Sequence, residues 1–160
     1  MNGAHWHLVV NHLPIIFPLV GIIVLIAGLI TKSTEVKRTA FMIFILGALA
    51  AVAAMTTGEG AEDVAEKLTG VTKTYIHHHE EAAEIFALLA YILGGISLIA
   101  IWVSFKKKNF SNAFAIGTLV FAVVVLFFAK KTGTIGGEIR HTEIRSVTPL
   151  PATEKSENNK

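Results

Sequence analysis

Four long apolar runs limit what this chain can fold into. They cover residues 8–30, 40–57, 82–105 and 112–130. A helix needs about 20 apolar residues to cross the hydrocarbon core of a bilayer, and each run is close to that length. Charged residues make up 16% of the chain, against about 25% in a typical soluble domain. The sequence therefore predicts an all-α protein, a four-helix transmembrane bundle in contact with the lipid bilayer.

The bundle is expected to occupy residues 1–131 and to be followed by a tail over residues 132–160. The tail opens with the glycine-rich stretch T-G-T-I-G-G-E-I-R-H and ends with P-A-T-E-K-S-E-N-N-K. The last stretch is polar and offers almost nothing to bury, so the C-terminal end is expected to be disordered.

Basic residues predict which side of the membrane each loop faces. The second loop carries only Lys67 and Lys73, among acidic residues. The first and third loops carry six basic residues: Lys32, Lys37, Arg38, Lys106, Lys107 and Lys108. By the positive-inside rule, the first and third loops face the cytoplasm. Four spans then put the N-terminus, the second loop and the tail on the outer side. Lys130 and Lys131, at the end of the fourth run, oppose this assignment but are outweighed.

All seven histidines fall on one face of the predicted bundle. They precede or open the first run, open the third, or follow the fourth: His5, His7, His12, His77, His78, His79 and His141. The even number of spans fixes this arrangement whichever way the protein is inserted. Acidic residues gather on the same face: Glu59, Glu62, Glu80, Glu81, Glu84 and Glu138. We therefore expect a polar site at the outer membrane face.

Several classes of function are disfavoured by what the sequence lacks. No Asp, Glu, Lys, Arg or His stands near the middle of a run, whereas pumps and ion transporters place such groups there. The absence of cysteine excludes thiolate zinc sites, cysteine-ligated iron–sulfur clusters and C-x-x-C-H haem attachment. The net charge of +2, without a basic stripe, argues against a nucleic-acid partner. The sequence assigns no enzymatic reaction.

The first hypothesis is a haem b protein of redox or electron-transfer function, because two imidazoles on facing helices can be the axial ligands of a haem. His12 and either His78 or His79 are the expected ligands. Two glycines in the third run would leave room for the ring, and an arginine would pair with a propionate. The residues expected at this site are His7, His12, His78, His79, Gly94, Gly95 and Arg140.

The second hypothesis is a transition-metal site for iron, copper or zinc, since neutral imidazole is the commonest protein ligand for these ions. Histidines and carboxylates three or four residues apart on a helix can bind one ion together. The expected ligands are His12, His78, His79, Glu80, Glu84, His141 and Glu59.

The third hypothesis is a non-catalytic accessory subunit of a membrane complex. The expected partner is a membrane redox complex or a second copy of the chain in a homodimer. In this case the histidines are hydrogen-bonded rather than ligating. The run from His77 to His79 would be a solvated turn at the interface, and His5 and His7 beside Trp6 would anchor the chain there.

Short motifs resemble a family of uncharacterised bacterial four-span membrane proteins. The opening H-L-V-V-N-H-L-P-I, residues 7–15, is similar to that family's H-P-x-x-V-H-F-P-I, with Leu8 and Leu13 replacing its Pro and Phe. The stretch G-T-I-G-G-E-I, residues 133–139, is similar to its closing G-x-x-G-G-E element. T-G-E-G-A-E-D-V and H-E-E-A-A, which begin at residues 57 and 79, resemble patterns of related membrane proteins.

The resemblance covers the four-span body and brings no established activity. It implies a multi-pass protein of the bacterial inner (cytoplasmic) membrane. It also singles out seven positions: His7, His12, His79, Glu80, Gly136, Gly137 and Glu138.

Overall fold

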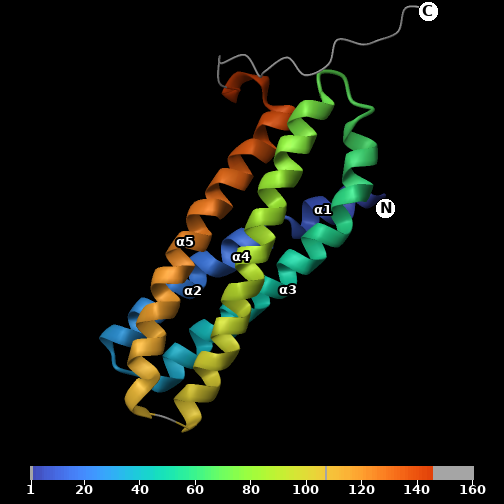
Figure 1. Ribbon diagram of the computed structural model, residues 1–160. Helices are drawn as coiled ribbons and strands as arrows, with labels where there is room; N and C mark the ends of the chain where they lie inside the picture. The colour runs from blue at the N-terminus through green and yellow to red at the C-terminus, as the bar shows by residue number, and fades with distance from the viewer. Residues whose placement is uncertain (1, 107, 146–160) are drawn as a thin grey trace, which may run out of the picture.

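Nearly every described residue is helical. The computed structural model describes residues 2–106 and 108–145, and it has no strand within these ranges (Figure 1). In chain order the helices are α1 (Gly3–Val10), α2 (Leu13–Ile30), α3 (Thr34–Ala65), α4 (Lys73–Lys106), α5 (Lys108–Arg140) and the short 3₁₀ helix η1 (Thr142–Ile144).

Four segments are long and apolar enough to cross a membrane. Their most apolar windows have mean hydropathies between 2.2 and 2.8, and at most 39% of any window is buried inside the bundle. The outward surface is therefore apolar, as contact with lipid tails requires. The segments are Gly3–Ile30, Thr34–Ala65, Lys73–Lys106 and Phe110–Arg140. These findings confirm the predicted all-α, multi-pass four-helix bundle.

Consecutive helices pack side by side and form a closed ring. α2 packs on α3, α3 on α4 and α4 on α5, and α5 returns to α2, whereas α1 lies on α3 (Figure 1). One end of the bundle holds α1, the connection between α3 and α4, and the end of α5 with η1. We call it the histidine end, because all seven histidines lie in these segments, in the first turns of α4 or directly before α2. The opposite end, where α2 turns into α3 and α4 into α5, is the basic end.

Pro14 explains why the first span consists of two helices. Proline lacks an N–H, and its ring excludes the carbonyl of the residue four positions earlier, which here is Val10. α1 ends at Val10, and α2 begins at Leu13 with Pro14 in its first turn. The Asn2 side chain caps α1 by accepting the His5 N–H at 3.0 Å. The short helix is thus delimited at both ends and packs on α3 separately from α2.

The turn between α2 and α3 contains a lysine in a left-handed conformation. Lys32 has a φ of 53°. The Ser33 N–H donates to the Gly28 carbonyl at 3.1 Å and the Lys32 N–H to the Leu29 carbonyl at 3.3 Å. This is a Schellman ending, in which glycine usually takes the left-handed position. Ser33 then caps α3 by accepting the Val36 N–H at 3.3 Å.

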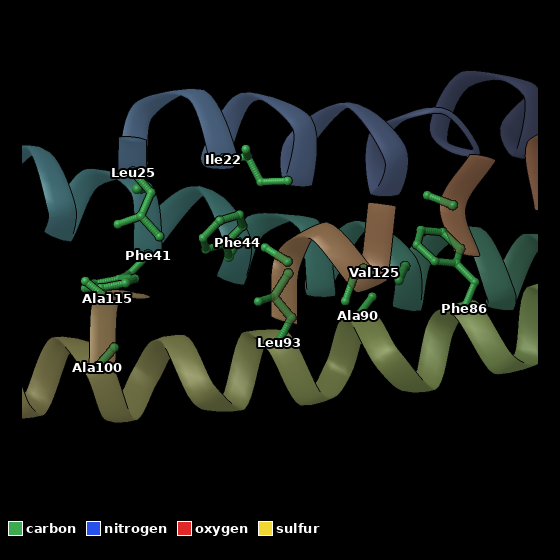
Figure 2. Close-up of a cluster of buried hydrophobic side chains, with 14 residues drawn as sticks. Ile22, Leu25, Phe41, Phe44, Phe86, Ala90, Leu93, Ala100, Ala115 and Val125 are labelled. Atoms are coloured by element: carbon green, nitrogen blue, oxygen red, sulfur yellow. The ribbon is translucent and has the colours of Figure 1, made fainter. Parts of the chain in front are cut away.

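Large side chains from all four long helices meet in the interior (Figure 2). The fully buried ones include Leu25 of α2, Phe41 and Phe44 of α3, Leu93 of α4 and Val125 of α5. Small residues fill the positions between them and let the helices approach closely. The buried alanines are Ala40, Ala50, Ala51, Ala87, Ala90, Ala100, Ala115, Ala122 and Ala129.

Three helices extend beyond the apolar runs. α3 continues to Ala65 instead of ending near residue 57, α4 begins at Lys73 instead of near 82, and α5 continues to Arg140 instead of ending near 130. The expected boundary between bundle and tail, after residue 131, therefore falls inside α5. Hydropathy marks only the part of a helix that lies in lipid, whereas backbone hydrogen bonding continues past it. The C-terminal end expected to be disordered lies outside the described residues.

Candidate functional site at the histidine end

His79 is the one residue of the triple histidine that turns towards the bundle. It lies on α4 three residues after the buried Ile76, and therefore on the same helix face. His77 and His78 are exposed. Nε2 of His77 lies 3.3 Å from the Glu81 carboxylate, and Nδ1 of His78 lies 3.8 Å from it. The three histidines form part of a continuous helix, and only two of them belong to its solvated face.

The His79 ring packs directly against α5. A Cβ atom added to Gly136 would lie 2.9 Å from the ring's Cε1 and 3.0 Å from Nδ1. The Thr132 backbone, one turn earlier on α5, also lies near the ring. Even so, Nδ1 is buried without a hydrogen bond of acceptable geometry to any described residue. The Thr132 hydroxyl is occupied elsewhere, since it donates to the Ala82 carbonyl on α4 at 3.0 Å.

His7 on α1 is held by the backbone of α3. Its Nδ1 lies 3.1 Å from the Ala54 carbonyl and 3.2 Å from the Thr57 hydroxyl oxygen. The Thr57 hydroxyl donates to the Ala53 carbonyl at 2.9 Å, which leaves its oxygen free to accept. A carbonyl can only accept, so Nδ1 of His7 carries the hydrogen. In the neutral ring, the lone pair therefore resides on Nε2.

His7 and His79 form a pair across the histidine end. Both rings are half-buried, and they lie close enough for their charges to interact. One comes from α1 and the other from α4, so only the tertiary fold brings them together. His12 also lies within electrostatic range of His7, but its side chain is exposed.

Two carboxyl groups accompany this pair. Glu62 of α3 and Glu80 of α4 lie within hydrogen-bonding distance of each other. Glu80 follows His79 directly in the chain and interacts with it electrostatically. A lysine lies at the same end, where Lys73 forms an ion pair of 2.9 Å with Glu66. The site thus combines two imidazoles with a contact between two acidic side chains.

Several predicted site residues lie apart from the pair. The expected ligands His12 and His78 are both exposed, as are Glu59, Glu84 and Arg140. His141 forms an exposed contact of 2.9 Å with Glu143. Hydrogen bonds from the backbone of Glu143 and from His141 hold the pKa of the Glu143 carboxyl below its usual value.

Gly94 and Gly95, the two glycines predicted to make room for a porphyrin, lie far from the histidine pair. A Cβ atom on Gly94 would lie 2.6 Å from Cβ of Ala48, so the neighbouring helix α3 already fills that space. Gly95 faces open space, with nothing within 4 Å of such an atom. Gly94 is also fifteen residues from His79 along α4, which is about 22 Å at the rise of an α-helix. Gly94 therefore serves close helix packing.

No preassembled metal site accompanies these residues. Within residues 2–106 and 108–145, no group of three or more His, Asp or Glu side chains is arranged to hold a metal ion. One further polar atom, the Asn11 side-chain oxygen between α1 and α2, is buried without a hydrogen-bond partner in the same part of the chain.

Sequence reasoning missed Thr57 and Thr132, and it did not pair Glu62 with Glu80. Threonine in a transmembrane helix usually bonds to its own backbone, as Thr57 also does here. Nothing in the spacing of these residues shows that they face a histidine.

A comparison of the chain with models of known protein families, with curated proteins and with solved structures gives no match.

Proposed function

We propose that this protein binds a b-type haem at its histidine end, with His7 and His79 as axial ligands, and that it takes part in electron transfer. A haem iron can take up to two ligands from the protein, because the porphyrin supplies four nitrogens. The pair offers two imidazoles from different helices. Of the predicted axial ligands, His12 with either His78 or His79, we keep His79 and replace the exposed His12 with His7, which is also among the predicted site residues.

The orientation of the imidazole nitrogens carries this proposal. Nδ1 of His7 lies 3.1 Å from the Ala54 carbonyl on α3, and Nδ1 of His79 is buried beside Gly136 of α5 without a hydrogen bond. Nε2 is therefore the nitrogen available to iron in each ring. A ligating histidine typically uses its other nitrogen in a backbone contact that fixes the ring orientation and tautomer, as His7 does here.

Ligation by two protein imidazoles leaves the iron no free position for a substrate. A haem held in this way would supply one-electron chemistry, and its expected partner would be a membrane redox complex. The basic end would face the cytoplasm. The histidine end, and with it the haem, would then lie at the outer face of a bacterial inner membrane.

The test is an absorption spectrum of the full chain, purified in detergent after expression with a haem precursor. We expect a Soret band and a sharpened α band on reduction. His7→Ala and His79→Ala should each lose the haem, whereas His77→Ala, an exposed neighbour on the same helix, should keep it. Absence of the band even after addition of hemin would refute the proposal, and so would a band that survives in both ligand variants.

A metal ion without porphyrin is the second candidate, because Glu62 and Glu80 lie within hydrogen-bonding distance beside His79. Two ionised carboxylates repel at that distance, and either a shared proton or a cation relieves the repulsion. Elemental analysis of the same sample decides between the candidates. Stoichiometric iron, copper or zinc without a Soret band, lost in Glu62→Gln, would favour this site over haem.

A further inference from the structure

The basic end contains a polar cavity that is separate from the histidine pair. It has a volume of about 500 Å³ and lies between the α2–α3 turn, the end of α4 and the start of α5. Its lining consists of Lys32, Thr34, Glu35, Lys37, Arg38, Ser104, Ser111 and Asn112. Three cations and one carboxylate give this lining a net charge of +2. Hydroxyl and amide groups supply further hydrogen-bond donors.

Lys37 places a buried positive charge in the lining of this cavity. It is only 4% exposed, and its Nζ donates to the Asn112 side-chain oxygen at 2.7 Å. An ammonium group has three donors, and the described residues provide this one acceptor and no carboxylate in contact. A charged group buried in this way is unfavourable unless an anion accompanies it.

The fold is shaped to admit this lysine. A Cβ atom on Gly28 of α2 would lie 2.8 Å from Cγ of Lys37 and 2.9 Å from its backbone N, so glycine permits the close approach of α3 and of the start of this side chain. The neighbouring Lys32 takes its left-handed conformation where glycine would be unstrained. Lysines thus stand at two positions of the lining that a glycine accommodates, Lys37 beside Gly28 and Lys32 at a positive φ.

Arg38 forms an ion pair with Glu35 and also contacts α4. Arg38 forms an ion pair of 2.7 Å with Glu35, donates to the Ser104 hydroxyl at 2.8 Å and stacks 3.5 Å from the Phe105 ring centroid. The one carboxylate of the lining is therefore committed to Arg38. The charges of Lys32 and Lys37 remain for a ligand.

We propose that this cavity binds a phosphate group, and that the phosphate belongs to an anionic membrane lipid. Lysine and the N-terminus of a helix, here that of α3, both favour such an oxyanion. Trp102, Phe105 and Phe110 are close in sequence to residues that line the cavity. Each of them is more than half exposed. An exposed tryptophan near the end of a span, such as Trp102, marks the level of lipid headgroups. Basic residues at that level attract anionic lipids.

The test compares thermal unfolding of delipidated full-length protein with and without added lipid. Phosphatidylglycerol should raise the unfolding temperature of the wild type, and phosphatidylcholine should not. Lys37→Met removes the buried charge while keeping the shape of the side chain. Without lipid it should unfold at the same or a higher temperature. It should bind phosphatidylglycerol about tenfold more weakly, the loss expected for one charge-assisted hydrogen bond.

Matched variants separate this site from general charge effects. Lys106→Met removes an exposed charge at the same end, outside the lining, and should leave the lipid response unchanged. Lys32→Asn removes a second charge from the lining at a position where asparagine tolerates a positive φ. It should weaken the response, and it serves if Lys37→Met does not fold.

Inorganic phosphate is the second ligand to test. A stabilisation by millimolar phosphate that depends on Lys37 would support the site and assign it to a soluble phosphate. Equal lipid responses in wild type and Lys37→Met would overturn the proposal. In that case Lys37 serves only as a donor to Asn112, and its loss should lower the unfolding temperature equally with and without lipid.

Discussion

The ring of His79 lies against Gly136, where a Cβ atom would come within 2.9 Å of it. The contact joins α4 and α5 at the histidine end. It explains why a glycine stands in the part of α5 that extends past the apolar run. Any larger residue there must displace the imidazole, since the ring is the movable partner.

Gly136→Ala is therefore expected to move the His79 ring without unfolding the protein. Alanine gains up to about 1 kcal/mol in helix propensity, which offsets part of the steric strain. We expect the net free energy of unfolding to change by less than about 1 kcal/mol. Haem content should fall, and diethyl pyrocarbonate should modify His79 faster in the haem-free protein. Gly133→Ala is the control, because its Cβ would meet Ile15 at an ordinary 3.5 Å.

Gly94→Ala and Gly95→Ala should have opposite effects on stability. At position 94 the new Cβ would meet Cβ of Ala48 at 2.6 Å, and neither atom can rotate away. Separating α3 from α4 should cost about 1–3 kcal/mol. At position 95 the space is open, so better helix propensity should stabilise by up to about 1 kcal/mol. Unfolding in mixed SDS micelles measures both, and effects of the same sign would contradict the packing described for α3 and α4.

Lys32→Gly should stabilise the delipidated protein. The left-handed conformation of Lys32 costs a residue with a Cβ atom about 1–2 kcal/mol, and glycine avoids this cost. Thr31→Gly is the matched control, since Thr31 has an ordinary φ of −76° and should lose stability through added chain entropy. Denaturant titrations of both variants provide the comparison. A loss of stability in Lys32→Gly would mean that the lysine side chain contributes more than its backbone costs.

Arg145 should hold the end of α5 to the connection between α3 and α4. Its guanidinium donates to the carbonyls of Glu138, Ile139 and Gly70 at 2.8, 3.1 and 3.1 Å. It also stacks 4.1 Å from the Tyr75 ring centroid. Arg145→Gln should speed amide hydrogen exchange in the last turn of α5, because carbonyls at a helix end lose their partner. Arg140→Gln, an exposed neighbour, should leave exchange there unchanged.

The number of spans, their order and the shared side of all histidines could be predicted from the sequence. Apolar length alone sets these features, since an apolar run that long has few alternatives to a helix in lipid. Hydropathy could not locate the helix ends. Residues 132–140, for example, are helical although they are polar and rich in glycine. Their packing against His79 and Ala82 is a tertiary effect.

The choice among the histidines could not be predicted for the same reason. The sequence predicts His12 as a ligand in both the haem and the metal hypotheses. Yet the break that Pro14 causes leaves His12 exposed between two helices. The third hypothesis made His7, next to Trp6, an interfacial anchor. The turn of α1 onto α3 brings it to Thr57 instead, and no sequence spacing encodes that contact.

The glycine contact at the start of α1 has a practical consequence for labelling the protein. A Cβ atom on Gly3 would lie 2.7 Å from the backbone of Gly60, so the start of α1 rests directly on α3. An affinity tag or fluorescent protein fused at the N-terminus would emerge from this contact, one helical turn from His7. Material tagged there could fail to bind the proposed haem for reasons unrelated to the native site. A fusion after Lys160 starts fifteen residues beyond Arg145 and is the sounder choice for spectroscopy.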